Sequence, residues 1–146
     1  MADLFPRRNS PAPLALSEAS ALTIELPMYS PQLLDHFQNP RNAGEIVNAD
    51  ATAEIENPAC GDVLRLTLKA SAGRITQVRF KAKGCVAAIA CASALTELVA
   101  GKMVNEAQSL QREDVSTAVG GLPQASTHAA QLALDVLSAA LSRIRT

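Results

Sequence analysis

Aromatic residues and net charge are both scarce in this sequence. Its 146 residues include no Trp, one Tyr and three Phe, and the formal net charge is −1. Proteins that bind single-stranded nucleic acid stack bases on aromatic side chains, and basic surfaces mark nucleic-acid binding in general. The sequence therefore predicts no nucleic-acid partner. Its length and its hydrophobic content of 48% fit one globular domain with a sizeable core.

Long apolar runs and abundant cysteine are also missing. No apolar stretch reaches the roughly 20 residues that span a bilayer. Pro6, Pro11 and Pro13 interrupt the segment around Arg7-Arg8, so no secretory signal is predicted. Three cysteines are an odd number in a chain long enough to fold without disulfides. We therefore expect a cytoplasmic chain with no membrane partner, whose cysteines fill the core, act as catalysts or bind metal.

The chain divides into an arm and a domain. Residues 1–27 are rich in Pro, Ser and Ala without a sustained period, and we interpret them as a flexible N-terminal arm. Residues 28–146 make up the domain. Ser30 before Pro31 is typical of a helix start, and Asn39-Pro40 predicts the end of that helix.

Alternating apolar and polar residues predict three strands near 52–56, 64–69 and 78–83, with a hairpin at Ser71-Ala72-Gly73. One face of these strands carries a basic row: Arg65, Lys69, Arg79, Lys81 and Lys83. We interpret this row as the solvated face of the sheet, on which Glu54 and Glu56 could pair with it across strands. A docking surface for an acidic partner is the alternative.

Helical patterns fill the rest of the chain. Residues 86–100 are apolar nearly all round and predict a buried helix that ends at Gly101. A helix over roughly 104–118 and another over about 126–143 follow, separated by a break at residues 120–123. Strands first and helices afterwards predict an α+β fold, a three-stranded antiparallel sheet with helices packed on one face.

The segment Pro-Ala-Cys-Gly-Asp, residues 58–62, places a thiol and a carboxylate just before the second strand. Side chains alternate along a strand, so Cys60 and Asp62 share a face with Leu64, in the row that faces the core. Gly61 between them allows a bend or a bulge. Both residues are therefore predicted to lie at one end of the core row, under the covering helices.

Two further segments offer ligands. In Lys83-Gly84-Cys85 a thiol stands where the third strand ends and the long helix begins, and the helix dipole together with Lys83 is expected to favour its thiolate. His128 follows the break at 120–123, in the first turn of the last helix. A thiolate pair, a carboxylate and an imidazole suit a metal ion.

Structural interpretations compete with the metal site. Free cysteines are often simply buried, and an Asp after Gly often forms a turn. Cys91 lies six residues after Cys85, a rotation of about 240° on a helix, so we interpret it as a core residue. His36, in the first helix, is interpreted as a structural or solvated histidine.

Taken together, several segments resemble the IscU/NifU N-terminal family of iron–sulfur cluster assembly scaffolds. The resemblance covers about residues 28–145. Its matching segments are Tyr29-Ser30, Asp35-His36, Asn39-Pro40-Arg41-Asn42-Ala43-Gly44, Asn57-Pro58-Ala59-Cys60-Gly61-Asp62, Lys83-Gly84-Cys85, Ala88-Ile89-Ala90, Thr96-Glu97-Leu98, Gly101-Lys102, Leu122-Pro123 and His128.

This resemblance implies a protein that takes sulfur from a cysteine desulfurase, builds a [2Fe–2S] cluster and passes it to apo iron–sulfur proteins. Cys60 and Cys85 match cluster-ligating cysteines, and Asp62 and His128 match the nearby Asp and His. The family's third cysteine directly follows the His, where this chain has Ala129. Residues 122–126 also depart from the Leu-Pro-Pro-Val-Lys that many members offer to a dedicated chaperone, so chaperone coupling is not implied.

Three functions remain open from the residues and the resemblance. The first is a scaffold or carrier, not an enzyme, that binds iron, a [2Fe–2S] cluster or zinc at Cys60, Asp62, Cys85 and His128. The second is a zinc-holding sulfur-transfer partner of a cysteine desulfurase, as in the SufU branch, with Cys85 as the persulfide acceptor. The third is an inactivated paralogue that binds the desulfurase and regulates it.

Overall fold

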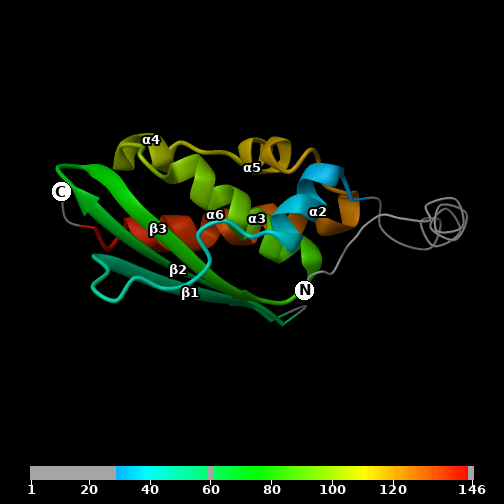
Figure 1. The fold of residues 1–146 in the computed structure, drawn as a ribbon, viewed down its shortest axis with the longest axis horizontal. Coiled ribbons are helices and arrows are strands. Elements are labelled where there is room, and N and C mark those ends of the chain that lie inside the picture. The colour runs from blue at the N-terminus through cyan, green and yellow to red at the C-terminus, as the bar shows by residue number, and fades with distance from the viewer. Residues whose placement is uncertain (1–28, 59–60, 145–146) are drawn as a thin grey trace, which may run out of the picture.

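The computed structural model describes residues 29–58 and 61–144, so the predicted arm 1–27 and Cys60 lie outside the described residues. Within them a three-stranded sheet is covered by helices on one face (Figure 1), which confirms the predicted α+β fold. The elements in chain order are α2 (Pro31–Gln38), β1 (Ala51–Asn57), β2 (Asp62–Ser71), β3 (Arg74–Lys83), α3 (Val86–Val99), α4 (Val104–Gln108), α5 (Arg112–Ala118), η1 (Gln124–Ser126) and α6 (Thr127–Leu141).

The sheet is an antiparallel meander in the order β1-β2-β3. Ala72 and Gly73 both have positive φ, 53° and 79°, as the two-residue turn between β2 and β3 requires. Asn57 pairs with Asp62 at the opposite end, and Val63 pairs with Lys83. The end of β1, the start of β2 and the end of β3 therefore meet at one end of the sheet, which is where Asp62 lies.

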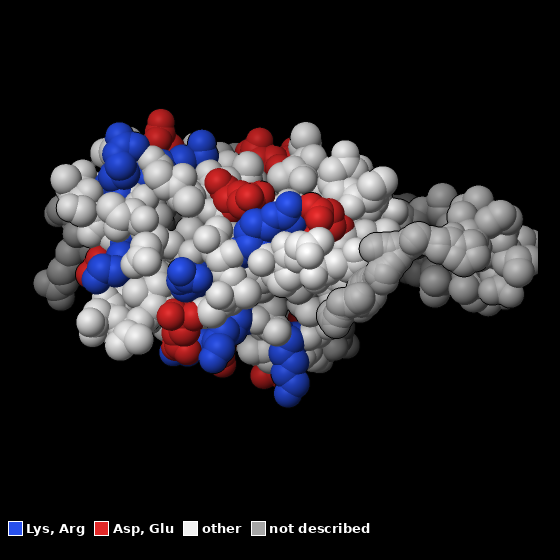
Figure 2. Space-filling view, viewed as in Figure 1, with Lys and Arg blue, Asp and Glu red and all other residues white. Residues whose placement is uncertain are grey.

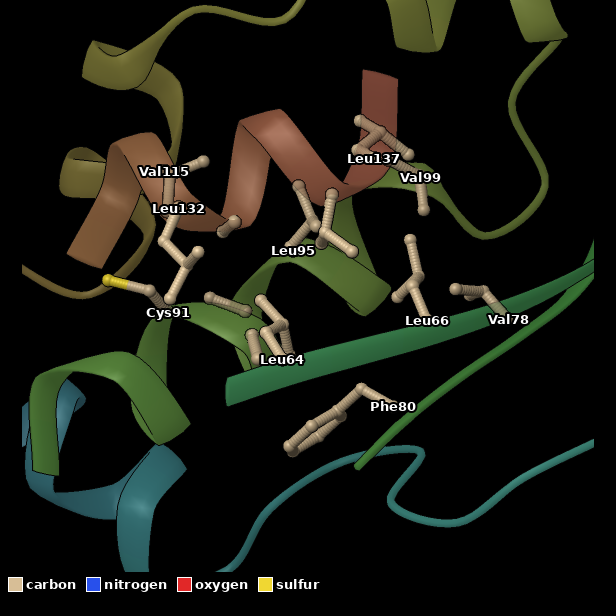
Figure 3. Close-up of a cluster of buried hydrophobic side chains, with 14 of the residues drawn as sticks. Leu64, Leu66, Val78, Phe80, Cys91, Leu95, Val99, Val115, Leu132 and Leu137 are labelled. Carbon is tan, nitrogen blue, oxygen red and sulfur yellow. The ribbon is translucent and has the colours of Figure 1, made fainter. Parts of the chain in front are cut away.

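The core lies between the inner face of the sheet and the helices α3 and α6. Leu64, Leu66 and Leu68 of β2 are fully buried against them, as the alternation predicts. Figure 3 shows this cluster between the strands and the two helices, with Cys91 as one of its members. Cys91 is completely buried. Its interpretation as a core residue is confirmed.

The outer face of the sheet is crossed by the segment 41–50, which sequence periodicity did not predict. The amide of Gly44 donates to the backbone carbonyl of Phe80 at 2.8 Å, and the amide of Ile46 donates to the buried Thr67 hydroxyl at 3.1 Å. Glu45 in this segment lies 2.8 Å from Arg65 and 3.6 Å from Lys81. The basic row is thus partly neutralised within the chain.

Helix α2 begins as predicted, with the Ser30 hydroxyl accepting from the amide of Leu33 at 2.9 Å. Its apolar stripe brings Leu33 into the core. His36, on the same helix, is only 7% exposed, and its Nδ1 lies 2.8 Å from the Ser93 hydroxyl on α3. The histidine is therefore structural and not solvated.

The helix predicted over 104–118 is wrong as one element, because the chain forms α4 and α5 with a break at residues 109–111. In each of the two helices, a carboxylate lies three residues after the residue that precedes the helix. Glu106 accepts from the Met103 amide at 2.9 Å, and Asp114 accepts from the Gln111 amide at 2.8 Å. These carboxylates satisfy amides that lack a helical partner. The break lets both short helices follow the surface of α3 and α6.

Surface charge gives no sign of a single-sign patch on the face seen in Figure 1. Figure 2 shows acidic and basic side chains interspersed there. Arg41, for example, lies 2.5 Å from Asp35 and 3.9 Å from Glu97. None of the helices in the described part of the chain has the length and apolar character needed to cross a membrane.

Candidate metal centre

Three predicted ligands from distant parts of the chain converge at the end of the sheet. Asp62 opens β2, Cys85 precedes α3, and His128 lies in the first turn of α6. Asp62 Oδ2 lies 3.4 Å from Cys85 Sγ and 3.5 Å from His128 Nε2. One donor atom from each residue lies within 4.8 Å of the other two. The structure thus brings a thiol, a carboxylate and an imidazole to one point.

The Asp62 carboxylate is the centre of this group. Its side chain is only 2% exposed, in line with its predicted place on the core-facing row. Oδ1 accepts a hydrogen bond from the backbone amide of Cys85 at 3.0 Å, and Oδ2 faces the thiol and the imidazole. One oxygen therefore fixes the start of α3, and the other faces the side chains that would share a metal.

Gly84 makes the close approach of Asp62 and Cys85 possible. Its φ of +146° lies in a region that L side chains rarely adopt. A Cβ at this position would lie 2.1 Å from Asp62 Oδ1 and 2.7 Å from its Cγ. Sequence reasoning missed this residue as part of the site, because the contact that demands glycine comes from a residue 22 positions earlier.

The prediction that Cys85 favours its thiolate is wrong for the described site. Burial raises the pKa of the Cys85 thiol, and the Asp62 carboxylate adds to the increase. The amides of Ala87 and Ala88 at the helix start act in the opposite direction without prevailing. The neutral thiol donates a hydrogen bond to Asp62 Oδ2 at 3.4 Å. A metal that binds here takes the place of that thiol proton.

The imidazole of His128 has a buried nitrogen atom without a hydrogen bond to any described residue. Its side chain is 38% exposed, yet Nε2 itself is buried and forms no hydrogen bond with any described residue. Most buried polar atoms have a hydrogen-bond partner, and a bound ion is one partner that would satisfy this nitrogen. Ligands of a tetrahedral zinc ion stand about 3.3–3.8 Å apart, given bonds of about 2.0–2.3 Å. The contacts of 3.4 and 3.5 Å around Asp62 match this spacing.

The remaining predicted residues contribute differently. Cys60, the fourth predicted ligand, lies outside the described residues. Ala129, directly after His128, is 1% exposed and belongs to the core. Burial raises the pKa of the Cys91 thiol to about 12, and the nearby Cys85 adds to the effect. Asp62, Cys85 and His128 are the grouping of potential metal ligands that the described residues form.

Residues 28–146 match the family described as the NifU-like N terminal domain. The chain belongs to this family. The match begins near the predicted domain boundary and includes Asp62, Cys85 and His128. The three potential ligands therefore all lie inside the NifU-like domain.

Relatives of this NifU-like domain are named as iron–sulfur scaffold proteins. Iron-sulfur cluster assembly scaffold protein IscU 1 from Archaeoglobus fulgidus is 44% identical over 114 residues, covering 78% of this chain and 74% of the relative. The IscU scaffold protein from Escherichia coli is 40% identical over 118 residues, covering 78% and 91%.

Solved structures share the fold of this NifU-like domain. FiSufU, a SUF-system protein from Fervidobacterium islandicum, superposes with a TM-score of 0.65 at 23% identity, over 77% of this chain and 96% of that protein. The N-terminal part of a NifU-like protein from Brucella abortus gives a TM-score of 0.65 at 19% identity, over 79% and 92%. These similarities support the architecture alone.

Proposed function

We propose that this NifU-like domain is an iron–sulfur cluster assembly scaffold that binds iron or a [2Fe–2S] cluster as its cargo. Cys85, Asp62 and His128 are the described ligands in this proposal, and Cys60 is a predicted fourth. The observation that carries it is the convergence of the three donor atoms within 4.8 Å, with one oxygen of Asp62 between the thiol and the imidazole. The identity of 40–44% to named scaffold proteins supports it.

The donor set suits cargo that is bound and later released. Thiolates favour iron–sulfur clusters, and imidazole suits iron and zinc, whereas carboxylates prefer harder ions. Nitrogen ligation of a [2Fe–2S] cluster occurs in Rieske centres. In this chain Ala129 supplies no third thiol beside His128. A cluster held by fewer thiolates is held less firmly, which favours transfer to an acceptor.

The residues around the metal would prepare the thiol for binding. Asp62 Oδ2 already accepts the hydrogen bond of the Cys85 thiol, so a proton acceptor stands beside the group that must be deprotonated. The Cys85 amide keeps Asp62 in place through its other oxygen. A cysteine desulfurase as sulfur source and apo iron–sulfur proteins as acceptors are the partners that this function requires.

Anaerobic reconstitution tests the proposal. Purified full-length chain is incubated anaerobically with ferric iron and sulfide, which together have the oxidation states of a [2Fe–2S] cluster, and visible absorption, iron and sulfide are measured per chain. We expect a [2Fe–2S] spectrum that Cys85→Ala and His128→Ala abolish or weaken strongly. Cys91→Ala, which removes a buried thiol outside the site, is the matched control and should behave as wild type. Iron and sulfide well below one per chain in the wild type would contradict the proposal.

A second candidate function is sulfur transfer by a zinc-holding chain. The separations of 3.4 and 3.5 Å around Asp62 Oδ2 support it, because zinc binds sulfur, nitrogen and carboxylate oxygen at such spacing. Incubation with a cysteine desulfurase and cysteine, followed by mass spectrometry, separates the two functions. A persulfide mass shift that Cys85→Ser removes, together with bound zinc and no cluster, would identify sulfur transfer. Cluster formation without a stable shift on Cys85 would identify the scaffold.

A further inference from the structure

The hydroxyl of Ser30 joins two elements that are far apart in the sequence. It accepts from the Leu33 amide at 2.9 Å and so caps helix α2. It also donates to the backbone carbonyl of Val119, which lies at the end of helix α5. One side chain thus satisfies the start of one helix and the end of another, 89 positions away.

The turn that Ser30 holds is packed closely against α2. Gly120 has a φ of +74°, and a Cβ there would lie 2.5 Å from Gln32 Oε1 and 2.7 Å from Ser30 Oγ. The Gly120 amide donates to the backbone carbonyl of Thr117 at 2.9 Å, and the Gly121 amide donates to that of Ser116 at 2.8 Å. The turn is therefore closed by its own hydrogen bonds, and its position relative to α2 is set at the Ser30 contact.

The same turn leads directly to the metal centre. From Gly121 the chain passes through Pro123 into η1, where the Ser126 amide donates to the Pro123 carbonyl at 2.8 Å, and α6 follows with His128 in its first turn. Few residues intervene, and they are held by local hydrogen bonds. A shift of the turn at Val119 and Gly120 would therefore be carried toward the imidazole.

The other end of α2 contacts α3, the helix that follows Cys85. His36 Nδ1 contacts the Ser93 hydroxyl on α3 at 2.8 Å, and that hydroxyl also accepts from the Arg41 amide at 2.8 Å. Between these ends Leu33 is fully buried. Helix α2 therefore links α3, which begins after Cys85, to the turn that precedes His128.

We propose that Ser30 is a positioning residue for the metal centre, which fixes the distance between His128 and Cys85 through helix α2. This inference rests on the proposed function, since it assumes that these side chains bind metal. The described hydrogen bonds of the Ser30 hydroxyl are to Leu33 and Val119, and not to Asp62, Cys85 or His128. The effect of Ser30 on metal affinity comes from holding the Val119–Gly120 turn against α2.

Binding of Co²⁺ to the full chain tests this role. We expect Ser30→Ala to weaken Co²⁺ affinity about tenfold, the effect of losing one or two hydrogen bonds that order the site. At equal occupancy, the visible bands of tetrahedral Co²⁺ should lose intensity. Ser30→Thr keeps a capping hydroxyl and should restore both affinity and spectrum. Ser142→Ala, which removes a hydroxyl at the far end of α6 from His128, is the matched control and should bind as wild type.

The outcomes separate this inference from the proposed function. Wild-type chain that binds no Co²⁺ would remove both. Two results would overturn the positioning role alone. In the first, the wild type binds Co²⁺ and Ser30→Ala binds it with the same affinity. In the second, Ser30→Ala binds Co²⁺ more weakly but Ser30→Thr does not restore the affinity. If Ser30→Ala does not fold, hydrogen exchange of the wild-type Leu33 amide decides. If the Ser30 contact is coupled to the metal centre, Co²⁺ slows exchange of the Leu33 amide in the wild type but not in Cys85→Ser. An exchange rate in the wild type that Co²⁺ does not change would overturn the positioning role of Ser30.

Discussion

At the residue scale, Gly84 is a position in the site that has no room for a side chain. We expect Gly84→Ala to destabilise the fold by about 2–4 kcal/mol and to abolish metal binding, because its new Cβ would collide with Asp62. Gly101→Ala is the matched control, since Gly101 also has positive φ, +84°, but open space around it. It should lose only about 1 kcal/mol and keep its metal affinity. Urea unfolding and Co²⁺ titration measure both, and equal losses in the two variants would contradict the collision.

Sequence reasoning singled out Asp62, Cys85 and His128, which the structure brings together, but it did not give the protonation of the Cys85 thiol. Strand parity predicted Asp62 on the core-facing row, and the sequence placed Cys85 where the third strand ends and the long helix begins, whereas their contact became visible only in the fold. The expectation of a thiolate failed because dipole and charge can be read from the local sequence, whereas burial and the Asp62 carboxylate come from the tertiary fold. The role of Gly84 was hidden for the same reason.

At the element scale, the contact between α2 and α3 gives the stability of the fold a pH dependence. Burial lowers the pKa of His36, and the positive charge of Arg41 lowers it further, against the smaller raising effects of Glu97 and Asp35. The unfolded chain therefore binds a proton near pH 6.5 that the folded chain resists. The stability that neutral His36 provides is complete above about pH 6.5 and declines as the pH falls from there toward the lowered pKa.

We accordingly expect wild-type stability to fall more steeply between pH 7 and pH 5 than that of His36→Gln. Urea midpoints across this range measure the difference in slope. His128→Gln, which removes the other histidine of the described chain, is the comparison for general acid effects. Parallel curves for the wild type and His36→Gln would show that His36 does not carry this dependence.

Some elements could be predicted from the sequence and others could not. The three strands and the long buried helix have strong periodicity, and Ser30-Pro31 is a local start signal that the structure confirms. The split between α4 and α5 depends on Glu106 and Asp114, whose carboxylates accept from backbone amides at the two helix starts. The apolar pattern does not reveal these hydrogen bonds. Segment 41–50 has no period, so its position over the sheet follows only from its contacts with Thr67, Arg65 and Phe80.

At the scale of the whole molecule, metal binding should stabilise the folded chain. The three proposed ligands come from β2, the start of α3 and α6, so the unfolded chain does not bring them together. A metal at about 100 times its dissociation constant therefore adds about 2.7 kcal/mol. We expect Zn²⁺ to raise the Tm of the wild type and of Cys91→Ala by several degrees, and that of Cys85→Ser and His128→Gln by much less. Equal shifts in all four would place the metal elsewhere.

The late position of His128 has a consequence for synthesis. The imidazole is delivered by α6, the last helix, whereas Asp62 and Cys85 emerge from the ribosome much earlier. A nascent chain that ends before α6 contains Asp62 and Cys85 but not yet His128. Under the proposed function, we expect binding of iron at full affinity to require that translation has released α6.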